Sequence, residues 1–124
     1  MIYGIGVDLI EVERIQKQLS RSDRFINRIF TPDEITYCEA KKNKAQNYAA
    51  RFAAKEAFFK ALGTGWRGGL AFNQVEIVND SLGKPEIRLH GKAEELIAER
   101  GITNICVSLT HLKDIASAVV TLEI

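Results

Sequence analysis

A helical pattern between Ala45 and Leu62 constrains the fold of this chain more than any other sequence feature. The segment is rich in alanine, and Gly63, a residue that commonly terminates helices, follows it directly. The chain has 124 residues, which fits one domain with a modest core. We therefore expect a single domain over residues 1–124, built around a long helix that buries one apolar stripe.

The remaining patterns place most helices early in the chain and most strands late. The expected helices are one that carries Val12, Ile15 and Leu19, a short one over Asp23–Phe30, one that begins at the cap residue Thr31, and one over Ala93–Arg100. The expected strands cover residues 2–7, 75–77, 87–89, 105–109 and 115–124. A turn is expected at 80–83, between the second and third strands. Loops are expected at 64–70, a segment that carries Trp66, and at 110–114. This order predicts an α+β fold in which an antiparallel sheet packs against the long helix.

The charge pattern indicates anionic partners at defined patches. The formal net charge is only +1, but residues 41–60 hold six basic side chains against one acidic side chain. A solvated helix face is the alternative for any one such stretch. No apolar run is long enough for a membrane helix, and no secretion signal is evident. We expect a cytoplasmic protein in which Cys38 and Cys106 stay reduced.

Glu56 lies within the apolar stripe of the long helix. At 100° per residue it falls close to Phe52 and Phe59, on the side that the helix is expected to bury. A carboxylate removed from water needs a cation, which can be an arginine, a lysine or a metal ion. Lys60, one turn later, could simply form an i, i+4 salt bridge with it.

Asp8 ends an otherwise apolar first strand, where a carboxylate has no packing purpose. A helix cap for the segment that begins near Ile10 is one interpretation. If the strand packs on the long helix, however, Asp8 and Glu56 approach each other and need a shared proton or cation. A few oxygen ligands with room for water suit Mg²⁺, which also binds substrate phosphates.

Other motifs carry less information. The pattern Gly4-Ile5-Gly6 lacks the third glycine of a dinucleotide-binding fingerprint, and Gly83-Lys84 is followed by Pro85, unlike a Walker A loop. His90 is expected at the surface. His111, in the predicted loop after Ser108, could bind phosphate or transfer a proton. Near-zero net charge and the lack of an aromatic row argue against nucleic-acid binding.

Taken together, these segments resemble the phosphopantetheinyl transferase family, and specifically its short bacterial members, the holo-acyl-carrier-protein synthases. The resemblance rests on residues 4–11 (GIGVDLIE), 51–60 (RFAAKEAFFK), 63–65 (GTG) and 108–111 (SLTH), which occur in the family's order and spacing. It implies Mg²⁺-dependent transfer of phosphopantetheine from coenzyme A to a serine of an acyl carrier protein, with release of adenosine 3′,5′-bisphosphate.

The resemblance also implies roles for individual residues. Asp8 and Glu56 match the magnesium ligands, and Lys60 matches a lysine near the pyrophosphate. Glu56 or a metal-bound water would take the proton of the attacking serine. The positions that match coenzyme A-binding residues are Arg51, Lys60, Gly63, Ser108 and His111. The positively charged face expected to dock the acidic carrier protein comprises Arg14, Lys17, Arg21, Arg24 and Arg28. Short members are homotrimers with sites between subunits.

Two rival interpretations remain open from the sequence. A small binding module with a basic face would explain the charge pattern but would leave Asp8 and Glu56 unaccounted for. A different magnesium-dependent nucleotide enzyme, such as a phosphodiesterase or hydrolase, would use the same two carboxylates.

Overall fold

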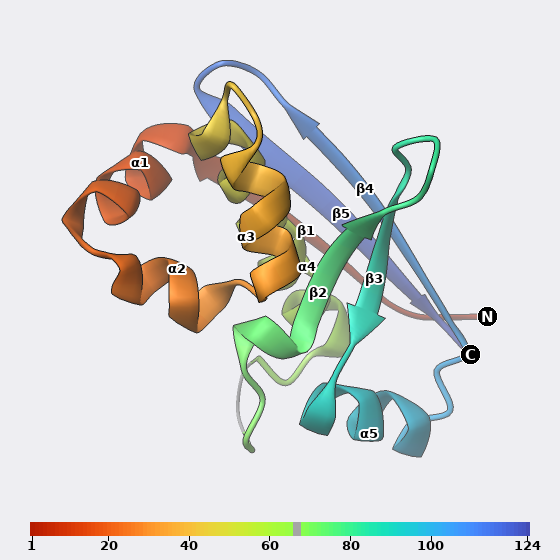
Figure 1. Cartoon of the computed structure of the whole chain (residues 1–124). Helices are drawn as coiled ribbons and strands as arrows, with labels where there is room; N and C mark the ends of the chain where they lie inside the picture. Colours follow the sequence, from red (N-terminus) through yellow and green to blue (C-terminus); the bar gives the residue numbers. More distant parts are fainter. Residues whose placement is uncertain (66–67) are drawn as a thin grey trace.

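A three-stranded antiparallel sheet, ordered β1-β5-β4, packs against one long helix, α4 (Figure 1). The computed structural model describes residues 1–65 and 68–124. The sheet consists of β1 (Ile2–Glu11), β4 (Asn104–His111) and β5 (Ile115–Glu123), and α4 spans Lys44–Leu62. The predicted α+β fold is therefore confirmed. Trp66, in the expected glycine-rich loop, lies outside the described residues.

The smaller elements surround the other sides of α4. They are α1 (Val12–Arg21), α2 (Asp23–Ile29), α3 (Pro32–Glu39), the short 3-10 helix η1 (Phe72–Gln74), the antiparallel hairpin of β2 (Val75–Asn79) and β3 (Pro85–Leu89), and α5 (Gly91–Glu99). The sequence predicts all of these segments to within a few residues except η1. No helix among the described residues has the length and apolar character needed to cross a bilayer.

Two helix ends follow directly from local sequence. The Thr31 side chain caps α3 by accepting a hydrogen bond from the backbone N–H of Glu34, and the Glu34 carboxylate accepts one from the backbone N–H of Thr31. Gly63 ends α4 in the left-handed conformation with φ of 85°, which a residue with a side chain adopts only with strain. Both ends lie where the sequence predicts them.

Two strand boundaries differ from the sequence prediction. β1 continues beyond Val7 to Glu11, so Asp8 lies within the strand, opposite Ala118 of β5. His111 is the last residue of β4, paired with Ala116, and not part of a loop. The long central strand β5 explains both differences, because it pairs with β1 and with β4 along almost its whole length.

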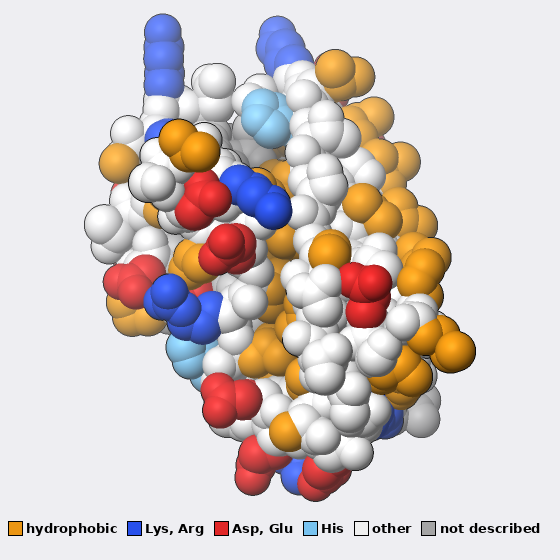
Figure 2. Space-filling model, turned by 90° about the vertical axis from the view of Figure 1, so that its right-hand side faces the viewer, with side chains coloured by type: hydrophobic (Ala, Val, Ile, Leu, Met, Phe, Trp, Pro, Cys, Tyr) orange, Lys and Arg blue, Asp and Glu red, His pale blue; other side chains and the backbone are white. Residues whose placement is uncertain are grey.

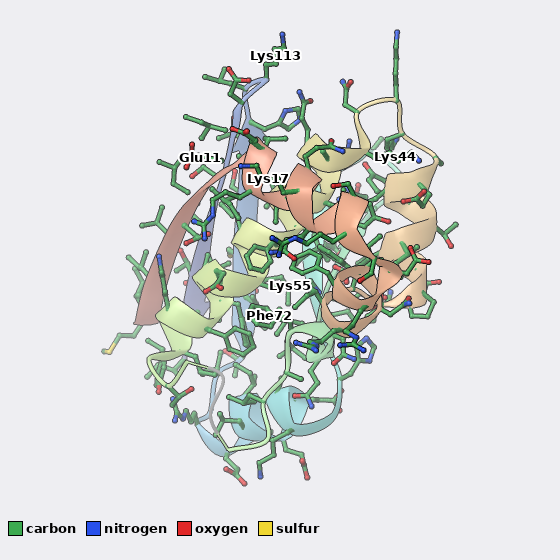
Figure 3. The ribbon with its side chains drawn as sticks, turned by 90° about the vertical axis from the view of Figure 1, so that its left-hand side faces the viewer. Glu11, Lys17, Lys44, Lys55, Phe72 and Lys113 are labelled. Carbon is green, nitrogen blue, oxygen red and sulfur yellow. The ribbon has the colours of Figure 1, made fainter. Side chains whose placement is uncertain are left out.

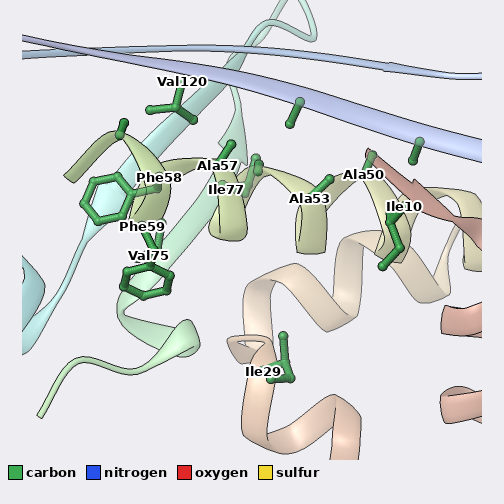
Figure 4. Packing of buried hydrophobic residues seen from close by; sticks show 14 of the residues in the cluster. Ile10, Ile29, Ala50, Ala53, Ala57, Phe58, Phe59, Val75, Ile77 and Val120 are labelled. Carbon is green, nitrogen blue, oxygen red and sulfur yellow. The ribbon is translucent and has the colours of Figure 1, made fainter. Parts of the chain in front are cut away.

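Glycines in β1 allow α4 to lie unusually close to the sheet. A Cβ atom built on Gly6 would lie 1.8 Å from the carbonyl oxygen of Ala57, and one on Gly4 would lie 2.0 Å from that of Ala61. Small side chains on α4 complete the close contact, and Figure 4 shows Ala53 and Ala57 on the side of the helix that faces the sheet. The sequence therefore fixes the distance between β1 and α4 through residues that lack bulk.

The opposite face of the sheet remains exposed and apolar. Ile5, Val7 and Leu9 on β1 are 60%, 60% and 67% exposed, because alternate residues of a strand point to opposite faces. Val119 on β5 is also exposed. Figure 2 shows hydrophobic side chains gathered along one side of the molecule. A patch of this kind is characteristic of a surface that another protein chain covers.

Candidate active site

Asp8 and Lys60 form an ion pair between β1 and α4. The Lys60 Nζ donates hydrogen bonds to Asp8 Oδ1 and to the Val7 carbonyl oxygen, each 3.0 Å long. The Asp8 side chain is 16% exposed and the Lys60 side chain 54%, so the pair lies at the surface end of the helix–strand contact. Asp8 does not cap α1, because the residue at the cap position is Glu11. The capping interpretation is therefore wrong.

Glu56 lies near this pair but is not its partner. The i, i+4 salt bridge to Lys60 that the sequence allowed is replaced by the bond from Lys60 to Asp8. Partial burial raises the pKa of the Glu56 carboxyl, the negative charge of Asp8 raises it further, and Lys60 opposes the shift. Lys60, which pairs with Asp8, also lines a hollow with Glu56, so the two carboxylates lie near each other where β1 meets α4.

The chemistry of this site fits a divalent cation. No group of three or more His, Cys, Asp or Glu side chains in residues 1–65 and 68–124 is arranged to hold a metal ion. Asp8 and Glu56 nevertheless offer carboxylate oxygens whose mutual repulsion a cation would relieve. Mg²⁺ commonly takes one or two carboxylates and completes its coordination with water and substrate phosphates, so two protein ligands are sufficient.

Glu56 lines a groove, which we call the basic groove. It has a volume of about 520 Å³ and lies between α1 and α2 on one side and the 70–72 segment on the other. Its lining includes Arg21, Arg24, Phe25, Arg28, Phe52, Glu56 and Phe72. Positive charge, aromatic surface and one carboxylate therefore meet in a single depression, which can receive an acidic partner and place it beside Glu56.

A second, smaller hollow joins Glu56 to the end of α4. It measures about 290 Å³ and is lined by Glu56, Phe59, Lys60, Gly63 and Gly65. The predicted nucleotide-binding residues Lys60 and Gly63 therefore lie beside the carboxylate site. A larger hollow between α1 and the start of α4 contains none of the predicted site residues among the residues that line it.

Arg51 lies apart from Glu56, on another side of α4. It is only 3% exposed, its Nη2 donates a 2.6 Å hydrogen bond to Asn79 Oδ1, and its guanidinium lies 3.9 Å from the centre of the Tyr37 ring. Its Nε is buried without a hydrogen-bond partner among the described residues. Arg51 therefore has a mainly structural environment in this chain, between Asn79 and Tyr37.

Ser108 and His111 are also separate from Asp8 within one chain. Ser108 is exposed on β4 and opposite Val119, so it belongs to the outer, apolar face of the sheet. His111 is exposed at the end of β4, where it pairs with Ala116. Asp8 points to the face opposite to that of Ser108, toward α4. A single subunit therefore brings together Asp8, Glu56, Lys60 and Gly63, but not Ser108 and His111.

The predicted docking residues are all exposed on α1 and α2. Arg21, Arg24 and Arg28 line the basic groove, whereas Arg14 and Lys17 lie outside its lining. Lys17 pairs with Glu13 on the same helix at 3.6 Å. The docking face is therefore continuous with Glu56 through Arg21, Arg24 and Arg28, which line the same groove.

Sequence reasoning assigned no role to Phe52, Phe72 or Lys55. Phe52 and Phe72 stack with ring centres 5.5 Å apart and line the basic groove. Phe72 lies 16 residues beyond Glu56 in η1, a three-residue 3-10 helix that is too short for a periodic pattern to indicate its position. The only available signal for Lys55 is its position on a side of α4 from which a side chain cannot reach solvent.

Comparison with known proteins identifies the family of this chain. The model of the 4'-phosphopantetheinyl transferase superfamily matches residues 4–120. A holo-[acyl-carrier-protein] synthase of Geotalea daltonii is 53% identical over 99% of both chains. The crystal structure of the Neisseria meningitidis holo-[acyl-carrier-protein] synthase has 38% identity and a TM-score of 0.92 over 99% of both chains.

A third relative carries a bound ligand. The Helicobacter pylori holo-[acyl-carrier-protein] synthase, solved in complex with coenzyme A, has 32% identity and a TM-score of 0.85, over 96% of this chain and 99% of its own. The match of the family model extends from β1, which carries Asp8, through α4, which carries Glu56 and Lys60, to β5. The chain with this two-carboxylate site therefore belongs to the 4'-phosphopantetheinyl transferase superfamily.

Proposed function

We propose that this protein transfers the 4'-phosphopantetheine group from coenzyme A to a serine of an apo-acyl carrier protein. The observation that carries the proposal is that Glu56 lines both the basic groove and the smaller hollow that contains Lys60, which in turn pairs with Asp8. The relatives from Geotalea daltonii and Neisseria meningitidis are named for this activity, and the Helicobacter pylori relative binds coenzyme A.

The cofactor of the proposed reaction is Mg²⁺, with Asp8 and Glu56 as its protein ligands. When bound, the ion supplies positive charge that stabilises the phosphate oxygens as negative charge builds on them. The raised pKa of Glu56 supports this assignment, since a carboxylate that is costly to ionise beside Asp8 gains from a nearby cation.

Lys60 is positioned to bind the phosphate that leaves. Its ammonium group donates to Asp8 and to the Val7 carbonyl, which leaves one of its three N–H donors for a phosphate oxygen. The carrier serine oxygen forms a bond to the β-phosphorus while the bond to adenosine 3′,5′-bisphosphate breaks. Glu56 or a water molecule takes the serine proton; a carboxyl with a raised pKa is suited to that role.

The acidic carrier protein is proposed to dock on the exposed arginine and lysine side chains of α1 and α2. Arg21, Arg24 and Arg28 lead along the basic groove to Glu56, so a carrier held by these side chains would present its serine at the carboxylate site. Opposite charge accelerates and orients such encounters. Fatty-acid carriers are the expected substrates, and polyketide carriers are an alternative.

The active unit is proposed to be a homotrimer in which neighbouring subunits complete the nucleotide site. The exposed apolar face of β1 and β5 supports subunit contact, and Ser108 lies on that face. The exposed Ser108 and His111 would then reach the coenzyme A bound at the Asp8 site of a neighbour, whereas the buried Arg51 would have to leave its contacts with Asn79 and Tyr37 to do so. Sedimentation equilibrium tests this assembly: Leu9→Glu should lower the oligomer mass, and a wild-type monomer would contradict it.

One assay tests the main proposal. Purified protein is mixed with an apo-acyl carrier protein, coenzyme A and Mg²⁺, and the carrier is then weighed by mass spectrometry. A gain of one phosphopantetheine group is expected, and it should disappear when Mg²⁺ is chelated. A carrier that binds but gains no mass would instead favour the binding module.

We also propose a cytoplasmic location. The two cysteines, Cys38 and Cys106, are free thiols, and the cytoplasm keeps thiols reduced.

A further inference from the structure

Lys55 is fully buried, and protein atoms use every one of its hydrogen-bond donors. Its side chain is 0% exposed. The Nζ donates to Glu34 Oε1 at 2.7 Å, to the Val75 carbonyl oxygen at 2.6 Å and to the Phe72 carbonyl oxygen at 3.1 Å. An ammonium group has three N–H donors, so Lys55 has none left for a substrate. Lys55 is therefore not a catalytic residue.

Glu34 connects the same pair to two further elements. Its Oε1 also accepts the backbone N–H of Thr31 at 3.0 Å, and its Oε2 accepts the backbone N–H of Ile77 at 2.9 Å. The carboxylate is 0% exposed. The Lys55–Glu34 pair thus joins α4, the start of α3, η1 and β2 by directional bonds.

Stability alone does not explain a buried ion pair of this kind. Removing two charges from water is costly, and apolar side chains of similar volume often stabilise a fold as well or better. Hydrogen bonds to backbone carbonyls, in contrast, fix the position of a short segment relative to the helix that donates them. The segment fixed here is 72–75, which contains η1 and the start of β2.

That segment forms a wall of the basic groove. The Phe72 ring stacks on Phe52 with centres 5.5 Å apart and meets Phe59 edge to face, also at 5.5 Å. Phe52, Phe72 and Glu56 all line the groove. Figure 3 shows Lys55 beside Phe72, in agreement with the hydrogen bond from Lys55 Nζ to the Phe72 carbonyl oxygen. Glu56 follows Lys55 directly on α4, so one helix holds both the carboxylate and the anchor of the opposite wall.

We propose that Lys55, held by Glu34, is a positioning residue for the carrier-protein substrate. It keeps the Phe72 wall at a fixed distance from Glu56, so that the serine-bearing part of the carrier fits between them. Coenzyme A binding at Asp8 and Lys60 does not depend on this wall. The inference rests on the proposed transferase function.

Three variants test the inference by separating stability from substrate positioning. Lys55→Met leaves Glu34 charged and buried, so it should lower stability and raise the KM for apo-carrier about tenfold. Lys55→Met/Glu34→Gln removes that unpaired charge and should regain thermal stability, but its KM for carrier should stay high because the Phe72 carbonyl is still released. In both variants the KM for coenzyme A should stay within twofold of wild type.

Phe72→Leu reduces the wall itself without touching the buried pair. It should raise the KM for carrier, and adding it to Lys55→Met/Glu34→Gln should have little further effect, because the wall is already displaced. If the KM for carrier recovers together with stability, or if Phe72→Leu leaves it unchanged, the inference is overturned. If neither Lys55 variant folds, the Phe72→Leu result decides alone. Absence of transfer by the wild type would reject the proposed function itself.

Discussion

Lys55 and Glu56 are consecutive residues of α4, yet they have opposite environments. Lys55 is fully buried and makes hydrogen bonds with all three of its donors. Glu56 is half-buried, lines two hollows and has no salt-bridge partner among the described residues. Burial lowers the pKa of the Lys55 ammonium, and the negative charge of Glu34 offsets part of this shift. The pKa of Glu56, in contrast, is raised by burial and by the negative charge of Asp8.

The difference teaches how to separate a structural charge from a reactive one. A charge whose partners are all supplied by the fold contributes to the position of backbone segments. A charge that the fold leaves incompletely compensated is available to a metal ion or a substrate. Both kinds occur on one helix here, and the following experiments test whether the distinction holds.

The largest effect is expected when the buried pair is broken. Lys55→Met should lower the free energy of unfolding by about 3–5 kcal/mol, because Glu34 is left charged and buried. Lys60→Met removes the exposed pair with Asp8 and should cost less than about 1 kcal/mol. Urea unfolding followed by circular dichroism measures both. Equal losses for the two variants would contradict the distinction.

The next effect concerns catalysis. Glu56→Gln should lower kcat by about 10²–10³-fold, the scale of losing one electrostatic group from an active site, while the fold is retained. The exposed Glu95 on α5 provides a matched control, since Glu95→Gln should leave the rate unchanged. Full activity of Glu56→Gln in the carrier assay would remove this residue from the mechanism.

The close contact of β1 with α4 should be sensitive to a single methyl group. Gly6→Ala would place a Cβ atom against the Ala57 carbonyl oxygen, so we expect a loss of about 1–3 kcal/mol and a lower transfer rate as Asp8 moves away from Glu56. Thermal unfolding and the carrier assay report the two effects. Ala57→Gly should not rescue the variant, because the clash is with backbone; rescue would disprove this cause.

The ionisation of two carboxylates, Glu76 and Glu56, should change the stability of the fold in opposite directions. Burial would raise the pKa of Glu76, but hydrogen bonds from Thr31 and His90 lower it overall, so its stabilising effect is present near neutral pH and is lost as pH falls through the lowered pKa. Glu56 has a raised pKa, so its ionisation weakens the fold as pH rises through that value.

Unfolding free energies measured from pH 7 to below pH 4 test these signs. Glu76→Gln should be less stable than wild type at pH 7, and the difference should shrink in acid. Glu56→Gln should be more stable than wild type at pH 7, by less than about 1 kcal/mol because Glu56 is partly solvated, and should lose that advantage in acid. The same sign for both variants would refute the contrast.

The smallest effect is expected on the docking face. Arg14→Glu reverses one exposed charge outside the basic groove and should raise the KM for carrier about threefold, with the KM for coenzyme A unchanged. The increase should diminish at high salt, where exposed charges are screened. Steady-state kinetics at two ionic strengths provide the measurement. An equal rise in both KM values would argue against docking.

Much of the fold follows from local sequence signals. The α4 helix, its end at Gly63 and the capping box at Thr31 depend on residues within a few positions of each other, so they were predicted correctly. The extension of β1 through Asp8 to Glu11 was not, because it depends on pairing with β5, more than 100 residues later. The same distance effect moved His111 from a loop into β4.

The positions of Asp8 and Glu56 on facing elements could be predicted because polar residues interrupt apolar patterns. Asp8 in an apolar strand and Glu56 in an apolar helix face each indicate a charge that needs a partner. Phe72 gave no such signal, since an aromatic residue near a strand is ordinary core material. The pairing of Lys60 with Asp8 in preference to Glu56 could not be foreseen, because helix spacing alone favours the nearer partner.

The shared helix also limits which length changes the protein can accept. Each residue inserted or deleted between Ala49 and Lys60 would rotate everything beyond it by about 100°. The packing alanines, Lys55 and Glu56 would then face the wrong neighbours all at once. Changes in chain length should therefore be confined to surface connections, such as residues 41–43 and the turn at 80–83, and engineered insertions are best placed there.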